Sequence, residues 1–154
     1  MKVYRVTKSP HVHDLSGIGS RIYGGRWNQK GTSIIYTSES RALATVEFLV
    51  HVPISIVPIN ISIVTIEIPD RIIPREISKS DLPTNWRDYP VPSELADIGT
   101  NWALSNETLL LRVPSIVIEH EFNMLINPSH SEMKHVVVSN IEKYKIDERL
   151  LRRK

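Results

Sequence analysis

Residues 23–51, YGGRWNQKGTSIIYTSESRALATVEFLVH, combine two glycine turns, a short strand and an amphipathic helix. Glycines indicate the two turns, and the apolar run 33–36 that follows has the length of a short strand. Ser38 is the expected N-cap of a helix over about residues 39–50. The segment therefore places a loop arginine, a strand-end tyrosine and a helix glutamate within one short unit: Arg26, Tyr36 and Glu47.

Glu47 falls on the apolar face of this helix, because residues spaced by three, four and seven positions lie on the same side. Leu43, Val46 and Val50 share that face. Away from water, a carboxylate is costly unless a partner compensates it. Such carboxylates occur both in structural ion pairs and at functional sites. With an arginine and a tyrosine nearby in the sequence, we favour a functional role for Glu47.

Arg26 directly follows the glycine pair Gly24-Gly25. The glycines permit positive φ and a close approach of the backbone to a ligand. The planar guanidinium suits an anion such as phosphate, to which it can donate two parallel hydrogen bonds. A tight turn followed by a surface arginine fits the same residues, and neither a P-loop nor a G-x-G-x-x-G motif is present. Tyr36 likewise fits either a site or a strand aromatic that faces the core.

The rest of the chain predicts one α+β domain, residues 1–154, with a largely antiparallel sheet. Apolar or alternating runs predict strands at 2–6, 59–68, 108–113, 116–118, 123–126 and 136–138. The apolar phase changes within residues 59–68, which predicts a bulge or bend near Ile63-Val64.

A second helix is expected to begin at Ser93, its predicted cap, and to bury Leu95, Ile98 and Trp102. The proline-rich segment 69–92 before it reads as a loop. Trp86 and Tyr89 are expected to hold that loop against the body of the domain.

Composition excludes several classes of protein. The chain has 154 residues and no cysteine, which excludes a disulfide scaffold, a thiol nucleophile and cysteine-based metal sites. We expect no signal peptide and no membrane span, and therefore a cytoplasmic protein. The formal charge is +2, but four basic residues lie among the last six, so residues 1–148 carry −2. This distribution disfavours a nucleic-acid interface.

Two further candidate sites are weak. His11, His13 and Asp14 have side chains that bind metals, but no further ligand follows at a suitable spacing, so we expect no metal site. Ser115 lacks the G-x-S-x-G elbow of a hydrolase nucleophile.

In order and spacing, residues over nearly the whole chain resemble the RES domain family. The resemblance rests first on 24–28 (GGRWN), Gly31, 36–38 (YTS), Ala42, Glu47 and His51. It extends to 4–6, Gly99, Trp102, 111–115 (LRVPS), 123–128, His130 and 146–150, with Glu148 where the family usually has proline.

The resemblance implies the fold of ADP-ribosyltransferase toxins, with a split sheet, and an enzyme that consumes NAD+ as substrate without a further cofactor. It implies these catalytic residues: Arg26, Tyr36, Glu47 and Ser115. The candidate substrate-binding residues are Arg5, Trp27 and Asn28.

Proteins of this family are toxins of bacterial toxin–antitoxin pairs. The resemblance implies a helix-turn-helix antitoxin as partner, whose C-terminal end occludes the active-site cleft. A homodimer within that complex is compatible with it, whereas direct contact with nucleic acid or a membrane is not expected.

The expected reaction breaks the nicotinamide–ribose bond, which makes the ribose oxocarbenium-like. Glu47 would stabilise that cation in the transition state. We expect Arg26 to hold the diphosphate or orient Glu47. Tyr36 would stack on the nicotinamide, and Ser115 would hydrogen-bond the ribose or the glutamate. The acceptor is water, phosphate or a protein (glycohydrolysis, phosphorolysis or ADP-ribosyl transfer). The alternative is a catalytically silent ligand- or partner-binding domain of the same fold.

Overall fold

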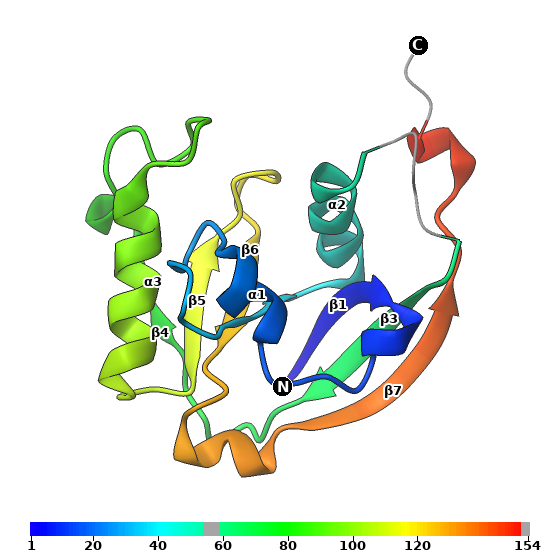
Figure 1. Cartoon of the computed structure of the whole chain (residues 1–154), viewed down its shortest axis with the longest axis horizontal. Coiled ribbons are helices and arrows are strands. Elements are labelled where there is room, and N and C mark those ends of the chain that lie inside the picture. Colours follow the sequence, from blue (N-terminus) through cyan, green and yellow to red (C-terminus); the bar gives the residue numbers. More distant parts are fainter. Residues whose placement is uncertain (54–58, 152–154) are drawn as a thin grey trace.

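A seven-stranded sheet organises the protein, whose computed structural model describes residues 1–53 and 59–151 (Figure 1). In spatial order the strands are β4 (Arg75–Glu76), β5 (Leu110–Pro114), β6 (Phe122–Ile126), β2 (Ile35–Ser38), β1 (Lys2–Lys8), β3 (Ile61–Glu67) and β7 (Val137–Tyr144). All neighbouring strands pair antiparallel except β4 and β5, which are parallel. The predicted α+β class is therefore confirmed. The basic residues 152–154 of the predicted tail lie outside the described residues.

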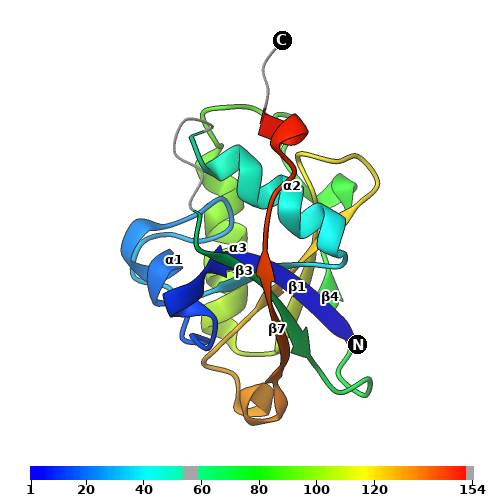
Figure 2. The same cartoon turned by 90° about the vertical axis from the view of Figure 1, so that its right-hand side faces the viewer.

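The sheet is divided between β2 and β1, as the family resemblance implies. A single residue pair, Tyr4 with Ser38, joins these two strands, whereas β1 and β3 pair along their whole lengths. Helix α2 (Arg41–His51) lies over this division and packs against both β1 and β2 (Figure 1). In the view at right angles, α2 lies above β1 (Figure 2).

Each half of the sheet has its own apolar core. Helix α3 (Ser93–Ser105) covers the half that contains β5, and its Leu95 and Trp102 pack there with Trp27 and Trp86. The other core joins residues of β1 and β3 to the inner ends of β2 and β6: Val3, Val64, Ile66, Ile35 and Ile126. Shorter elements are α1 (Ile18–Tyr23) and 3-10 turns at Ser9–His11, Lys79–Asp81, Ser131–His135 and Glu148–Leu151.

Both predicted helix caps are wrong by one or two residues. The N-cap of α2 is Ser40, whose side chain accepts a hydrogen bond from Leu43 N, and Ser38 instead ends strand β2. The N-cap of α3 is Pro92, so Ser93 is the first helical residue and its side chain caps nothing. Several N-cap-forming residues stand next to one another in residues 37–40, and the pairing of β2 decides which of them begins the helix.

Two other expectations are corrected. Residues 116–118 form bends, not a strand. The bulge near Ile63-Val64 is absent from β3. The pairing of β3 with β7 shifts later, where Thr65 and Ile66 face Asn140 and Val138, so the extra residue lies in β7. The first six residues of β3 are buried on both faces of the strand. The alternation of apolar residues therefore cannot show which face is turned to the core, and it does not predict a bulge here.

Two aromatic or aliphatic side chains are more exposed than the sequence predicts. Trp86 is buried as expected, but Tyr89 is 90% exposed. Val50 lies near the C-terminal end of α2 and is half exposed, because the apolar face of this helix meets the sheet only along its first two turns. Among residues 1–53 and 59–151, no helix has both the length and the hydrophobicity that crossing a membrane requires.

Candidate active site

Glu47 lies half-buried on α2, where this helix stands over the division of the sheet. Its Oε1 accepts hydrogen bonds from Ser115 Oγ at 2.8 Å and from Asn123 Nδ2 at 2.6 Å. Both donors use the same oxygen. In the described part of the chain no group donates a hydrogen bond to Oε2, so this second oxygen remains available to a ligand. A carboxylate on an apolar helix face needs compensating contacts, and for Glu47 two neutral hydrogen-bond donors provide them.

Ser115 is buried directly after β5 and is held from two sides. Its Oγ accepts from the backbone N–H groups of Val117 and Ile118, each at 3.1 Å, and its own N–H donates to Glu121 O. The one hydroxyl proton is therefore directed to Glu47. The expected contact of Ser115 with the glutamate is present, and a contact with the ribose stays a prediction.

Asn123, on β6, is a site residue that sequence reasoning did not assign. Ser38, at the end of the neighbouring strand β2, donates its hydroxyl to Asn123 Oδ1 at 2.7 Å, while the amide nitrogen donates to Glu47. These contacts span 85 and 76 positions of the chain. No local motif could reveal them, because they depend on the pairing of β2 with β6.

An ion pair beside the site ties together the strand ends that carry these groups. The guanidinium of Arg112 on β5 forms a bidentate pair with Glu39, which lies between β2 and α2. It also stacks over the Phe122 ring, 3.5 Å from the ring centroid. The Glu39 N–H donates to Phe122 O. Strands β2, β5 and β6 are thereby fixed together next to Ser38, Ser115 and Asn123.

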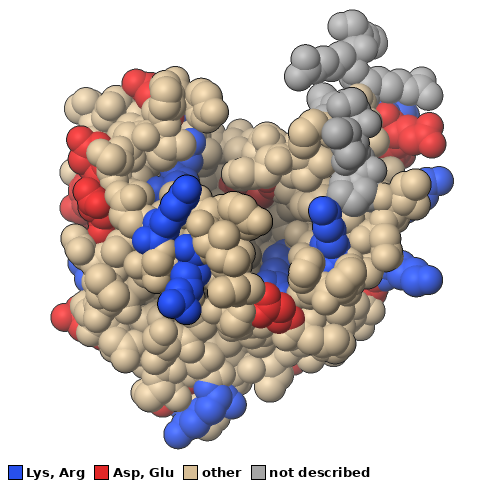
Figure 3. Space-filling view, viewed as in Figure 1, with Lys and Arg blue, Asp and Glu red and all other residues tan. Residues whose placement is uncertain are grey.

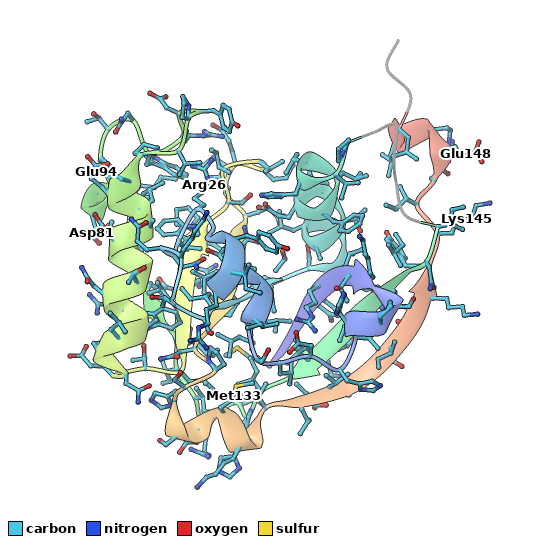
Figure 4. The ribbon with its side chains drawn as sticks, viewed as in Figure 1. Arg26, Asp81, Glu94, Met133, Lys145 and Glu148 are labelled. Atoms are coloured by element: carbon cyan, nitrogen blue, oxygen red, sulfur yellow. The ribbon has the colours of Figure 1, made fainter. Side chains whose placement is uncertain are left out.

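Arg26 lies between α1 and β2, and in the view of Figure 4 it appears between α3 and α2. Its Nη1 donates to the backbone oxygen of Trp86 at 3.1 Å. Burial lowers the pKa of Arg26, and the charges of Glu47 and Tyr36 oppose that change. Arg26 therefore interacts with the Glu47 carboxylate through its charge. Among the described residues, the arginines that form ion pairs with carboxylates are others: Arg41, Arg71, Arg75, Arg87, Arg112 and Arg149. Figure 3 shows the surface hollowed between the two halves of the molecule.

The Tyr36 hydroxyl both donates and accepts a hydrogen bond within the protein. It donates to Asn28 Oδ1 at 2.7 Å and accepts from Trp27 N at 3.0 Å. Burial raises the pKa of Tyr36 far above its usual range, and the hydrogen bond from Trp27 only partly offsets this. The phenol therefore remains protonated and clamps the loop that presents Arg26.

Asn28 and Gly25 complete this clamp. Asn28 is buried, and its Nδ2 donates to the backbone oxygens of Ser20 in α1 and of Gln29 and Thr32 in the loop. Gly25 lies against the phenol: a Cβ there would stand 2.6 Å from the Tyr36 oxygen. Gly24 has φ +72°, the left-handed region that favours glycine. Both glycines are needed for the path of this loop.

The three residues expected to bind substrate occupy different environments. Trp27 and Asn28 are 3% and 1% exposed, so their side chains pack within the protein and support the Arg26 loop. Arg5 is partly buried on β1 and donates from Nη2 to the backbone oxygens of His11 and Asp14, at 2.9 and 2.5 Å. Burial lowers the pKa of Arg5. A direct contact of any of the three with substrate stays a prediction.

A cavity of about 170 Å³ adjoins the site behind Ser115. Trp86, whose backbone oxygen accepts from Arg26, and Ser115, whose hydroxyl donates to Glu47, are both among its walls. Of the candidate metal ligands in residues 11–14, the Asp14 carboxylate accepts hydrogen bonds from Ser16 N and Oγ. Within the described ranges, no three His, Asp or Glu side chains gather as a metal site would require.

Comparisons with known proteins agree with this architecture. The model of the RES domain family matches residues 2–147. The Prs ADP-ribosylating toxin of Sphingobium sp. (strain YBL2) is 39% identical over 142 residues, covering 91% of this chain and 88% of that protein. Toxin Res of Photorhabdus laumondii is 34% identical over 159 residues, covering 100% of this chain and 99% of that protein.

The fold also matches a solved structure. In the crystal structure of the M. tuberculosis MbcT-MbcA toxin-antitoxin complex, one chain superposes with a TM-score of 0.71 at 17% identity, covering 97% of this chain and 86% of that one. This likeness concerns the fold alone. The family match and the two relatives settle the classification: the chain belongs to the RES domain family.

Proposed function

We propose that this protein is the toxin of a bacterial toxin–antitoxin pair and that it cleaves the nicotinamide–ribose bond of NAD+. The observation that carries the proposal is the Glu47 carboxylate, held through Oε1 by Ser115 and Asn123 with Oε2 left unoccupied. The names of the relatives support it, since one is an ADP-ribosylating toxin and another is a Res toxin.

Cleavage of the nicotinamide–ribose bond is favoured by a carboxylate held in this way. As the C1′–N bond breaks, its electron pair leaves with nicotinamide, which departs neutral, and positive charge develops on the ribose. Glu47 Oε2 can face this charge from a fixed position, so that the electrostatic stabilisation needs little reorganisation in the transition state. An acceptor oxygen then bonds to C1′ and passes any proton to solvent.

Arg26 is the group we assign to the diphosphate of NAD+. It is cationic, partly desolvated and fixed on a loop that Tyr36 and Asn28 clamp from behind. Desolvation strengthens the attraction of a guanidinium for phosphate oxygens. The Tyr36 ring, whose hydroxyl faces the protein interior, is left to stack on the nicotinamide.

Water, phosphate and a protein side chain all remain acceptors in this proposal. The name of the Sphingobium relative favours a protein for that relative. We propose a helix-turn-helix antitoxin as the partner, with its C-terminal end occluding the cleft between Arg26 and Glu47, and we propose a cytoplasmic location. The toxin-antitoxin complex that shares this fold supports an antitoxin partner at the coarser level.

The test is direct product analysis. Purified protein is incubated with NAD+ in a phosphate-free buffer, in phosphate, and with a cell lysate, and the products are identified by mass. We expect free nicotinamide in at least one condition. ADP-ribose, ADP-ribose phosphate or ADP-ribosylated protein then identifies the acceptor. If NAD+ binds but nicotinamide is absent in all three conditions, the protein is a silent binding domain and the proposed enzyme is refuted.

A further inference from the structure

We propose that Asn123 is a positioning residue for Glu47 and that Ser38 fixes the orientation of its amide. The proposal rests on the function proposed above and adds to it two residues to which the sequence assigned no such role. The three side chains come from α2, β6 and the end of β2, and they form one continuous chain of hydrogen bonds from Ser38 through Asn123 to Glu47.

The direction of each hydrogen bond in this chain follows from the charge at one end. An ionised carboxylate only accepts hydrogen bonds, so the Asn123 group that lies 2.6 Å from Glu47 must be its NH₂. The amide oxygen then points to Ser38, whose hydroxyl lies 2.7 Å away and must donate. Ser38 is buried. A reversed amide would place two acceptors against each other at Glu47, which low polarity makes costly.

The arrangement fixes which carboxylate oxygen is free. Asn123 and Ser115 approach Oε1 from two different strands, and Ser115 is itself held by two backbone N–H groups. Two donors on one oxygen restrain rotation of the carboxylate and leave Oε2 for the developing cation. With either donor removed, the remaining one still permits the carboxylate to turn.

The two donors bring no second charge to the carboxylate, since a serine hydroxyl and an asparagine amide are both neutral. Among the described residues, Arg26, from the loop before β2, interacts through its charge with Glu47 and with Tyr36 on β2, and the Arg112–Glu39 pair lies beside the site. On α2 itself, His51 contacts only the backbone oxygen of Glu47. Asn123 thus donates a hydrogen bond without adding a charge. An aspartate at this position would add a negative charge and, when ionised, could not donate.

The test compares Asn123→Ala, Asn123→Asp and Ser38→Ala with wild type. Asn101→Ala, on the exposed face of α3, and Ser129→Ala, exposed after β6, serve as matched controls. The rate of nicotinamide release is measured against NAD+ concentration at neutral pH. Thermal unfolding of each variant shows whether it is folded.

For Asn123→Ala we expect kcat to fall about 10-fold to 100-fold, the loss typical of a hydrogen bond to a charged group, with KM changed less than about threefold. Asn123→Asp should lose more activity at neutral pH, because a second carboxylate faces the first. Ser38→Ala should lose about threefold to tenfold, since the amide keeps its donor but loses its orientation.

A rise in KM at constant kcat would overturn the proposal, because Asn123 would then contact substrate rather than position Glu47. An unchanged kcat in Asn123→Ala would overturn it as well. A second measurement does not depend on activity: the ¹³C chemical shift of the Glu47 side-chain carboxyl carbon at neutral pH, which reports the hydrogen bonds made to that group. It should change in Asn123→Ala and stay as in wild type in Asn101→Ala. If wild-type protein releases no nicotinamide, the proposed function fails, and this chemical shift still decides the role of Asn123, because an unchanged shift in Asn123→Ala would overturn it.

Discussion

Ser115 donates its hydroxyl proton to Oε1 of Glu47 over 2.8 Å, although 68 positions separate the two residues in the chain. The contact joins the end of β5 to the middle of α2, across the division of the sheet. It makes the carboxylate part of a fixed hydrogen-bond network before any ligand binds. Pre-arranged charge of this kind is what electrostatic catalysis requires.

Replacing Ser115 by alanine should therefore weaken catalysis more than binding. We expect kcat for nicotinamide release to fall about 10-fold to 100-fold, because a hydrogen bond to a charged group contributes about 1.5–3 kcal/mol. The N–H groups of Val117 and Ile118 also lose their acceptor, so the melting temperature should drop by a few degrees. Steady-state kinetics and calorimetry measure both. An unchanged kcat would show that this contact does not serve the reaction.

The role of Arg26 in binding the diphosphate can be tested by replacing it with lysine, which keeps the positive charge but lacks the planar guanidinium. If Arg26 holds the diphosphate, Arg26→Lys should raise KM for NAD+ roughly 10-fold to 100-fold and leave kcat within about threefold. Arg21→Lys, on the exposed surface of α1, is the control. A fall in kcat at constant KM would contradict diphosphate binding and assign Arg26 to the orientation of Glu47.

Tyr36 gives a prediction for stability at alkaline pH. Its folded-state pKa lies above the value of 10.0 that an exposed tyrosine has, so near and above that pH the folded chain binds more protons than the unfolded one. Its contribution is complete below about pH 9 and is lost as the pH rises through about 10 and beyond. Urea unfolding of wild type should thus lose stability from about pH 9 to 11, and Tyr36→Phe should lose less.

Tyr89→Phe is the control for this experiment, since Tyr89 is 90% exposed. It should keep the alkaline loss of wild type. Equal pH dependence in wild type and Tyr36→Phe would contradict the burial of the phenol. At neutral pH, Tyr36→Phe should cost about 1–3 kcal/mol of unfolding free energy, because Asn28 and the Trp27 N–H lose their partner.

Gly99 provides a test of how α3 supports the Arg26 loop. A Cβ at this position would stand 1.9 Å from the backbone oxygen of Trp27, a distance no relaxation of side chains can relieve. Gly99→Ala should therefore destabilise the protein by about 3 kcal/mol or more. Gly19→Ala, in α1, meets nothing within 4 Å and should be neutral or slightly stabilising. Chemical unfolding of the two variants should separate them clearly, and equal stability would refute the close packing.

Local patterns in the sequence predicted much of this arrangement. The apolar face of α2 identified Glu47 as an unusual carboxylate. The predicted strand and helix of residues 23–51 both form, but the strand is Ile35–Ser38 instead of 33–36 and the helix is capped by Ser40 instead of Ser38. These features depend on residues within a few positions of one another, which is the range over which periodicity and turn chemistry act. The burial of Trp86, Leu95 and Trp102 was predicted for the same reason.

Features that depend on strand pairing could not be predicted from local sequence patterns. The role of Asn123 and the use of Ser38 as its partner exist only because β2 lies beside β6. Ser115 was identified through the family resemblance, since its neighbours in sequence suggest no chemistry. Likewise, the direction of the Tyr36 hydroxyl, into the protein, is set by Asn28 and could not be read from a strand pattern.

The central claim, that the Glu47 carboxylate drives cleavage of NAD+, is tested most directly by one substitution. Glu47→Gln keeps the size of the side chain and an oxygen that can accept from Ser115 and Asn123, but removes the negative charge. The initial rate of nicotinamide release from saturating NAD+ is measured for wild type and for this variant at equal concentration. We predict a rate lower by about 10²–10³-fold, with the melting temperature preserved. A Glu47→Gln protein that releases nicotinamide at the wild-type rate would contradict the claim.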